Sequence, residues 1–179
     1  MGDLRRMIGP PLWKSFHDFY GFTREESLVV ADEYRAFFDE LGPEEYPVFE
    51  GIPELLDGLA AQEHRMAVAT SRMEAKCIDM VRELGLCQFE AVVGMNPPQG
   101  RETKADSVRD ALAALGARSD EAVMIGDRMD TDMVAGIETG LYTALVLSGV
   151  TDRADIKKFP YRPQLVLNGV GDIPDVPAK

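Results

Sequence analysis

The first quarter of the chain carries apolar residues at helical spacing. Residues 23–41 open with a Thr-x-x-Glu capping box, formed by Thr23 and Glu26, and apolar side chains then recur every three or four positions. Gly42, which is followed by a proline, ends this pattern. In the preceding stretch, 12–20, aromatic side chains fall on one side of a helix. The pattern therefore predicts two helices and no strand in this part of the chain.

From Val48 onward, short apolar runs alternate with segments of helical spacing. The runs expected to form strands are 66–69, 89–93, 121–125, 143–147 and 164–167. Helices are expected over 53–62, from Ser71 to Gly85, from Thr103 to Gly116 and up to Gly140. This alternation is typical of an α/β fold with a Rossmann-like parallel sheet and helices on both faces. We therefore expect a helical segment, 1–46, followed by an α/β core, 47–179.

Composition narrows the classes of protein that fit this pattern. The chain has 179 residues, 45% of them hydrophobic, and 31 acidic against 19 basic side chains give a net charge of −12. Such a charge does not favour nonspecific binding to the phosphate backbone of nucleic acid. No apolar run is long enough to span a bilayer, the start lacks a signal-peptide hydrophobic region, and two cysteines make no disulfide framework. We expect a cytoplasmic protein with neither a nucleic-acid nor a membrane partner.

Most of the net charge lies between Asp18 and Glu63. That segment holds thirteen Asp and Glu residues against two arginines, Arg24 and Arg35. Solvent-facing sides of surface helices explain such a segment. A docking surface for a basic partner is the alternative, and no second feature of the sequence supports it.

A cluster of carboxylates follows the third expected strand, at the edge of the sheet where ligands bind in open α/β folds. Asp127, Asp130 and Asp132 fall within six residues and repel one another unless a cation or fixed donors hold them. Oxygen ligands of this kind suit Mg²⁺. The alternative is a set of helix N-caps, which explains Asp130 but explains Asp127 poorly, since that residue sits at the strand exit. Asp127 and, with less support, Asp132 are therefore candidate metal ligands.

Two further groups follow or precede helices near the same edge. Thr70, Ser71 and Arg72 come after the first expected strand, where hydroxyl and backbone N–H groups make an anion site. The alternative there is simple N-capping by Ser71, with Glu74 as its capping-box partner. Lys104 lies in the first turn of a helix, where the dipole disfavours a cation, although a solvated surface lysine is the simpler explanation.

In this chain order, the candidate residues resemble the motifs of the haloacid dehalogenase-like phosphatase superfamily. Thr70 is similar to its second motif, Lys104 to its third, and the pair Asp127 and Asp132 to its fourth, Gly-Asp-x-x-x-x-Asp. The opening from 8 to 12 and the helices after it resemble the helical cap of phosphoglycolate phosphatase-like members. The stretch 126–149 looks more like nitrophenyl-phosphatase and nucleotide-phosphatase members.

The resemblance implies a function and a role for each residue. It implies a Mg²⁺-dependent phosphatase acting on small phosphorylated metabolites through an aspartyl-phosphate, with a small helical cap and possible homo-oligomers. Thr70, Ser71, Arg72 and Lys104 would bind the phosphoryl group. Asp127 would hold Mg²⁺, and Asp132 would support the metal or Lys104. The implied catalytic residues are Thr70, Lys104 and Asp127.

One departure from the family pattern concerns the nucleophile. Family members open with a hydrophobic strand ending Asp-x-Asp-x-Thr or Asp-x-Asp-x-Val, and nothing before Leu12 can supply that strand. By analogy the strand would lie in the middle of the sheet, beside the strand that leads to Asp127. Two hypotheses follow: an N-terminally shortened phosphatase, or a non-catalytic phosphate-binding or interaction module of the same fold. A phosphorelay receiver domain is a weaker alternative, because it would place its acidic pair first and its lysine last.

Overall fold

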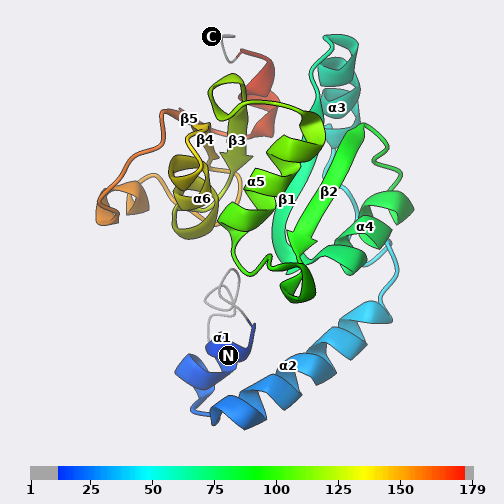
Figure 1. The fold of residues 1–179 in the computed structure, drawn as a ribbon, viewed down its shortest axis with the longest axis vertical. Coiled ribbons are helices and arrows are strands. Elements are labelled where there is room, and N and C mark those ends of the chain that lie inside the picture. The colour runs from blue at the N-terminus through cyan, green and yellow to red at the C-terminus, as the bar shows by residue number, and fades with distance from the viewer. Residues whose placement is uncertain (1–11, 176–179) are drawn as a thin grey trace. The chain divides into compact units, whose positions relative to one another are not determined.

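The computed structural model describes residues 12–175 (Figure 1), and the chain divides into two units, Met1–Pro47 and Val48–Lys179. The stretch 8–11, to which the sequence assigned part of a cap-like opening, lies outside the described residues. Within 12–175, no helix combines the length and the apolar character that crossing a membrane requires.

The first unit contains two helices, α1 (Leu12–Tyr20) and α2 (Arg24–Asp39), as the apolar spacing predicted. The capping box is present, since Thr23 Oγ1 accepts from the Glu26 N–H at 3.2 Å and the Glu26 carboxylate accepts from the Thr23 N–H at 2.8 Å. The two helices pack against each other, and small side chains are fully buried in this unit. Because small side chains take up little width, they allow two helix backbones to approach closely. These buried small residues are Ser15, Ser27 and Ala31.

The second unit alternates strands and helices, so the predicted α/β class with parallel strands is confirmed. Its strands are β1 (Met66–Met73), β2 (Phe89–Met95), β3 (Val123–Gly126), β4 (Tyr142–Val146) and β5 (Leu165–Leu167). Its α-helices are α3 (Ile52–Ala61), α4 (Glu74–Glu83), α5 (Lys104–Leu115) and α6 (Val134–Glu138). Shorter helical turns are η2 (Pro97–Gln99), η3 (Ser119–Glu121), η4 (Met129–Met133), η5 (Asp155–Lys158) and η6 (Val170–Asp175).

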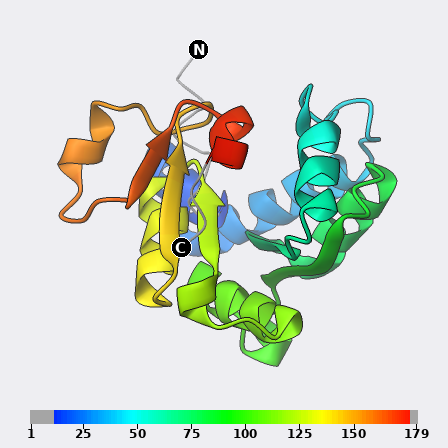
Figure 2. The same cartoon turned by 90° about the horizontal axis from the view of Figure 1, so that it is seen from above.

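The strands form two separate parallel sheets where one sheet was expected. One sheet pairs β1 with β2, and the other has the order β3-β4-β5 (Figure 2). Among the described residues, β1 and β3 therefore each keep one edge without a strand partner. Unpaired edges inside a parallel sheet are unusual, because their backbone N–H and C=O groups need hydrogen-bond partners.

Helix α5 connects the two sheets through a shared apolar core. Ala105 and Val108 of α5 belong to one buried cluster with Met124 of β3, and Ala69 of β1 packs against that cluster. The same helix also contacts β2. A second buried cluster lies at the β3-β4-β5 sheet and includes Leu145 of β4. Its members are Met129, Met133, Leu145 and Ile156. The two sheets are therefore held at a common helix although no strand joins them.

The predicted Ser71–Glu74 capping box is wrong. Strand β1 continues through Ser71 to Met73, and α4 begins at Glu74 with no side-chain cap. The reason is a stronger competitor for the carboxylate, because the guanidinium of Arg101 contacts both oxygens of Glu74 at 2.5 Å. A charge-assisted pair of this kind is roughly twice as strong as a neutral hydrogen bond.

Candidate functional site

The segment after β3 folds back over its own beginning. β3 ends at Gly126, and a π-helical turn over Met129–Met133 brings the side chain of Asp132 onto that glycine. A Cβ atom at position 126 would overlap the carboxyl group of Asp132. The close approach therefore requires glycine before Asp127, and it places Asp132 beside the end of the strand.

Asp132 is a buried carboxylate whose two oxygens both accept hydrogen bonds. Oδ2 accepts from the backbone N–H of Asp127 at 2.9 Å and from that of Arg128 at 3.0 Å. Oδ1 accepts from the ammonium of Lys104 and, at 3.5 Å, from the hydroxyl of Thr131. Only 5% of its side chain is exposed, so these donors replace water around the charge. Asp132 thus fixes both the loop that carries Asp127 and the position of Lys104.

Lys104 is the first residue of α5 and is held by its ion pair with Asp132. A cation at a helix N-terminus faces the positive end of the dipole, and the partner carboxylate compensates for this. The side chain is 17% exposed. An ammonium group has three N–H donors, so the bond to Asp132 leaves two for a ligand.

Asp127 is contacted by the loop that follows β4. Its Oδ2 accepts from the backbone N–H of Val150 at 2.8 Å, and its main-chain oxygen accepts from the N–H of Thr151 at 3.1 Å. The hydroxyl of Thr151 in turn accepts from the N–H of Met129 at 3.3 Å. Among the contacts that the described residues make, Oδ1 of Asp127 has no donor. That oxygen is the one available to a cation.

The residues of the second motif lie on the other sheet. Thr70 is half-buried in the second half of β1, and its Oγ1 accepts from the N–H of Arg72 at 3.1 Å, which leaves the hydroxyl proton free to be donated. Ser71 and Arg72 are exposed. Within residues 12–175, no hydrogen bond joins Thr70 or Ser71 to Lys104. Direct contacts therefore bring Lys104, Asp127 and Asp132 together, whereas the hydroxyl residues make no such contact with Lys104.

Mg²⁺ is the cation that the sequence suggested for this site. Among the described residues, no three His, Cys, Asp or Glu side chains converge in a way that could hold a metal ion. Mg²⁺ commonly binds one or two carboxylates together with waters and substrate phosphate. The carboxylates of the site fit that sparse mode of binding, in which Asp127 would supply one oxygen. The role of Asp132 as a metal ligand stays a prediction, because both of its oxygens already accept hydrogen bonds.

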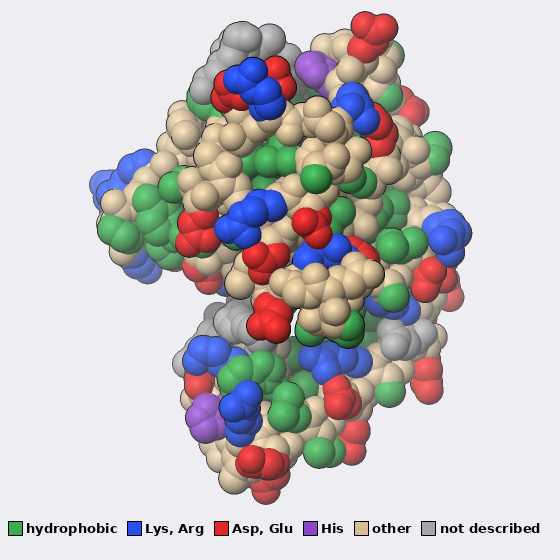
Figure 3. Space-filling model, in the orientation of Figure 1, with side chains coloured by type: hydrophobic (Ala, Val, Ile, Leu, Met, Phe, Trp, Pro, Cys, Tyr) green, Lys and Arg blue, Asp and Glu red, His purple; other side chains and the backbone are tan. Residues whose placement is uncertain are grey.

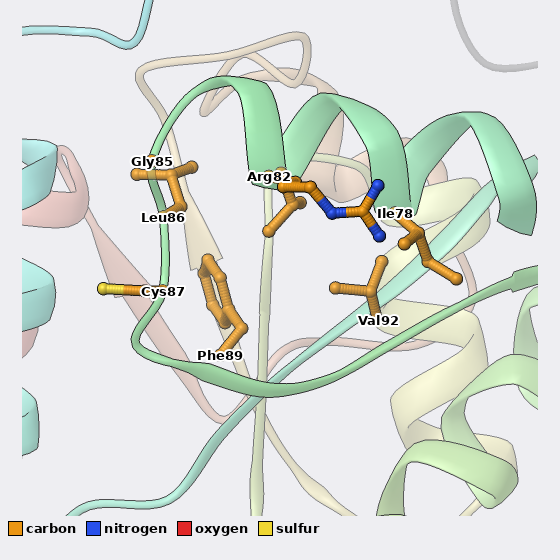
Figure 4. Close-up of a pocket in the computed structure, with 8 residues that line it drawn as sticks. Ile78, Arg82, Gly85, Leu86, Cys87, Phe89 and Val92 are labelled. Carbon is orange, nitrogen blue, oxygen red and sulfur yellow. The ribbon is translucent and has the colours of Figure 1, made fainter.

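A pocket elsewhere in the unit is not part of this site (Figure 4). It lies between the C-terminal half of α4 and the beginning of β2, and its lining is mostly apolar. The lining residues are Ile78, Val81, Arg82, Gly85, Leu86, Cys87, Phe89 and Val92. Phe89 is the first residue of β2, so the pocket lies toward the amino end of that strand, away from the carboxyl ends where the candidate residues lie.

Two features of the site were not found from the sequence. One is the pairing of Arg101 with Glu74. The only local signal at Glu74, its spacing of three residues from Ser71, indicated a helix cap instead. The other is the contact of Val150 and Thr151 with Asp127. Ser148 and Gly149, which follow the apolar run 143–147, indicate a loop there but not the residue that the loop contacts.

Comparison with known proteins places this arrangement in a family. The family model described as HAD-hydrolase-like matches residues 103–173, which contain Lys104, Asp127 and Asp132. A predicted phosphatase from Clostridium acetobutylicum has a similar crystal structure, with a TM-score of 0.81 and 30% identity, covering 97% of this chain and 81% of that one. The chain belongs to the haloacid dehalogenase-like hydrolase superfamily.

Two curated relatives of this chain have names that state an activity on phosphorylated small molecules. A dihydroxyacetone phosphatase from Corynebacterium glutamicum is 45% identical over 85 residues, which are 48% of this chain and 31% of that protein. A 5′-nucleotidase from Pseudomonas aeruginosa is 33% identical over 139 residues, which are 77% of this chain and 62% of that protein. The matched part of the chain therefore spans 31% and 62% of the lengths of these two relatives.

Proposed function

We propose that this chain forms most of a Mg²⁺-dependent phosphatase that hydrolyses phosphomonoesters of small metabolites, either phosphoglycolate-like or nucleotide-like. The observation that carries the proposal is the buried Lys104–Asp132 ion pair beside Asp127, at the carboxyl end of β3. It presents a cation with two spare donors next to a carboxylate with one spare oxygen. This pairing of charges suits a phosphate group bound together with a divalent cation.

Each residue has a role in that reaction. Lys104 would neutralise charge on the phosphoryl oxygens, and the hydroxyl of Thr70 would donate a hydrogen bond to them, with Ser71 and Arg72 at the same end of β1. Asp127 would hold Mg²⁺, which supplies positive charge against the phosphate. Asp132 keeps Lys104 and the loop of Asp127 in place.

The proposal includes a strand that carries the nucleophilic aspartate and lies outside the described residues. Its support is the pair of unpartnered edges on β1 and β3, both beside α5, because a parallel strand between them would join the two sheets into one. The first aspartate of the motif would attack phosphorus, the second would protonate the leaving alcohol, and water would then hydrolyse the aspartyl-phosphate to release inorganic phosphate. The coding sequence upstream of Met1 tests this, since an in-frame hydrophobic run ending Asp-x-Asp would supply the strand.

The alternative is a non-catalytic phosphate-binding or interaction module of the same fold, which needs no such strand. Hydrolysis of p-nitrophenyl phosphate with and without Mg²⁺, together with calorimetric binding of inorganic phosphate, separates the two. We expect Lys104→Ala and Asp127→Asn to abolish phosphate binding and any turnover. The matched controls are Lys158→Ala and Asp155→Asn, which remove a solvent-exposed ion pair elsewhere.

Three outcomes decide between the hypotheses. Mg²⁺-dependent turnover that both site variants abolish supports the phosphatase. The second hypothesis, a non-catalytic module, is supported if a chain extended through its upstream coding sequence binds phosphate and Mg²⁺ but shows no turnover. Turnover or binding that neither Lys104→Ala nor Asp127→Asn changes would show that the site is elsewhere.

A further inference from the structure

A half-buried ion pair links the start of α4 to the connection between β2 and α5. The guanidinium Nη2 of Arg101 lies 2.5 Å from both carboxylate oxygens of Glu74, and the two side chains are only 12% and 19% exposed. Exposed ion pairs contribute little to a fold, whereas a shielded pair with further hydrogen bonds holds its neighbours in place. None of the roles assigned above uses this pair.

Glu74 binds residues at the end of β2 and directly after it. Its carboxylate also accepts from the N–H of Gly94 at 3.3 Å and from the side-chain amide of Asn96 at 3.1 Å. The backbones meet closely here, because a Cβ at position 94 would lie 2.6 Å from the carbonyl oxygen of Arg72 and 2.7 Å from the Cα of Glu74. Only glycine fits this position, so the end of β1 and the end of β2 are tightly joined.

Arg101 donates to several protein groups. Its Nε donates to the carbonyl of Gly94 at 3.1 Å, and its Nη1 donates to the carboxylate of Asp110 in α5 at 2.8 Å. Its backbone exchanges two hydrogen bonds with Asn96, of 2.9 and 3.2 Å, which close the small loop around η2. Each of the three guanidinium nitrogens donates to a protein group, and four of the five N–H donors are used in this way, so Arg101 mainly connects elements of the fold.

The position of the pair in the sequence gives it a consequence for the site. Glu74 follows Thr70 by four residues, and Arg101 precedes Lys104 by three. Since no hydrogen bond joins Thr70 directly to Lys104 within the described residues, the ion pair is a polar link between the segments that carry them. Resting on the proposed function, we propose that Arg101 and Glu74 are positioning residues that set the Thr70 hydroxyl and the Lys104 ammonium at the separation a phosphate group requires.

The test measures binding of inorganic phosphate with Mg²⁺ to the full chain by calorimetry. Arg101→Gln and Glu74→Gln should each weaken phosphate affinity about tenfold, because small displacements of binding groups are costly. The double variant should be no weaker than either single variant, since both act through one contact. Arg101→Lys should restore part of the affinity, because lysine can pair with Glu74 but lacks the fork that also reaches Gly94 and Asp110.

The control is Arg109→Gln, which removes an exposed ion pair with Asp106 in the same helix and should leave phosphate affinity unchanged. Thermal unfolding of every variant shows that binding is measured on folded protein. Unchanged phosphate affinity in Arg101→Gln, or additive losses in the double variant, would overturn the positioning role alone. Absence of phosphate binding by the unaltered chain would overturn the proposed function, and the positioning role with it.

Discussion

At the scale of single residues, the site depends on the carboxylate of Asp132, which makes several contacts at once. Asp132 accepts two backbone N–H groups and the ammonium of Lys104 while almost completely buried. A buried charge is tolerated only when fixed donors replace its water, and these three donors do so. The same contacts explain why Gly126 precedes Asp127, because a side chain there would displace Asp132.

Asp132→Asn is therefore expected to destabilise the chain far more than removal of an exposed charge. An amide keeps one acceptor but turns a donor toward Lys104, so the ammonium loses its partner in a half-buried position. We expect a loss of about 2–4 kcal/mol in the free energy of unfolding, measured in urea. Asp155→Asn, at an exposed ion pair, should cost about 0–1 kcal/mol. Similar small losses for both variants would contradict the structural role of Asp132.

At the scale of elements, helix α5 shows where sequence reasoning succeeds. Its predicted limits, after Thr103 and before Gly116, agree with the structure because both end signals are local. The capping box of Thr103 with Asp106 and the positive φ of 59° at Gly116 involve only neighbouring residues. Local chemistry of this kind is visible in the sequence without knowledge of the fold.

The capping box of α5 also predicts a pH dependence. Hydrogen bonds from the hydroxyl and then the N–H of Thr103 lower the pKa of Asp106 below its ordinary value of 3.8. The unfolded chain therefore binds more protons than the folded chain as the pH falls through this range, and stability is lost. The unaltered chain should therefore be more stable than Asp106→Asn by the largest margin at neutral pH. This difference in unfolding free energy should shrink as the pH falls below 3.8. Urea unfolding at several pH values measures it, and a constant difference would contradict the prediction.

Helix α4 shows where the same reasoning fails. Its start was assigned to Ser71 because Glu74 stands three residues later, yet Glu74 pairs with Arg101, 27 residues away. The division into two sheets is equally invisible, because it depends on which strand edges meet across the fold. The candidate residues stay predictions, although the element ends beside Asp127 and Lys104, on which their choice depends, are present in the structure. Their mutual geometry depends on contacts between distant segments, which the sequence pattern does not specify.

At the scale of the whole molecule, charge does not gather where the chemistry is. On the face drawn in Figure 3, basic side chains of the described residues lie among acidic ones and form no continuous basic surface. The excess of acidic residues lies mainly between Asp18 and Glu63, in the two helices of the first unit, in α3 and in the segments that connect or follow them. In the proposed function, specific binding of a phosphate group would therefore depend on the few residues around Lys104 rather than on the overall electrostatic field.

The division into two units leads to the last prediction. Both buried apolar clusters lie entirely within Val48–Lys179, as do Lys104, Asp127 and Asp132. A fragment with its own core is expected to fold alone. Residues 48–179 should therefore unfold cooperatively, with a midpoint within about 8 °C of the full chain, corresponding to roughly 2–3 kcal/mol.

Thermal unfolding followed by circular dichroism compares the fragment with the full chain, and calorimetry compares their affinities for inorganic phosphate. Inorganic phosphate has no organic part for the first unit to contact, so the two affinities should agree. A fragment that folds but has lost phosphate binding would show that the first unit supplies part of the phosphate site. A fragment without a cooperative transition would show that the two units depend on each other for stability, because the core of the second unit would then be insufficient alone.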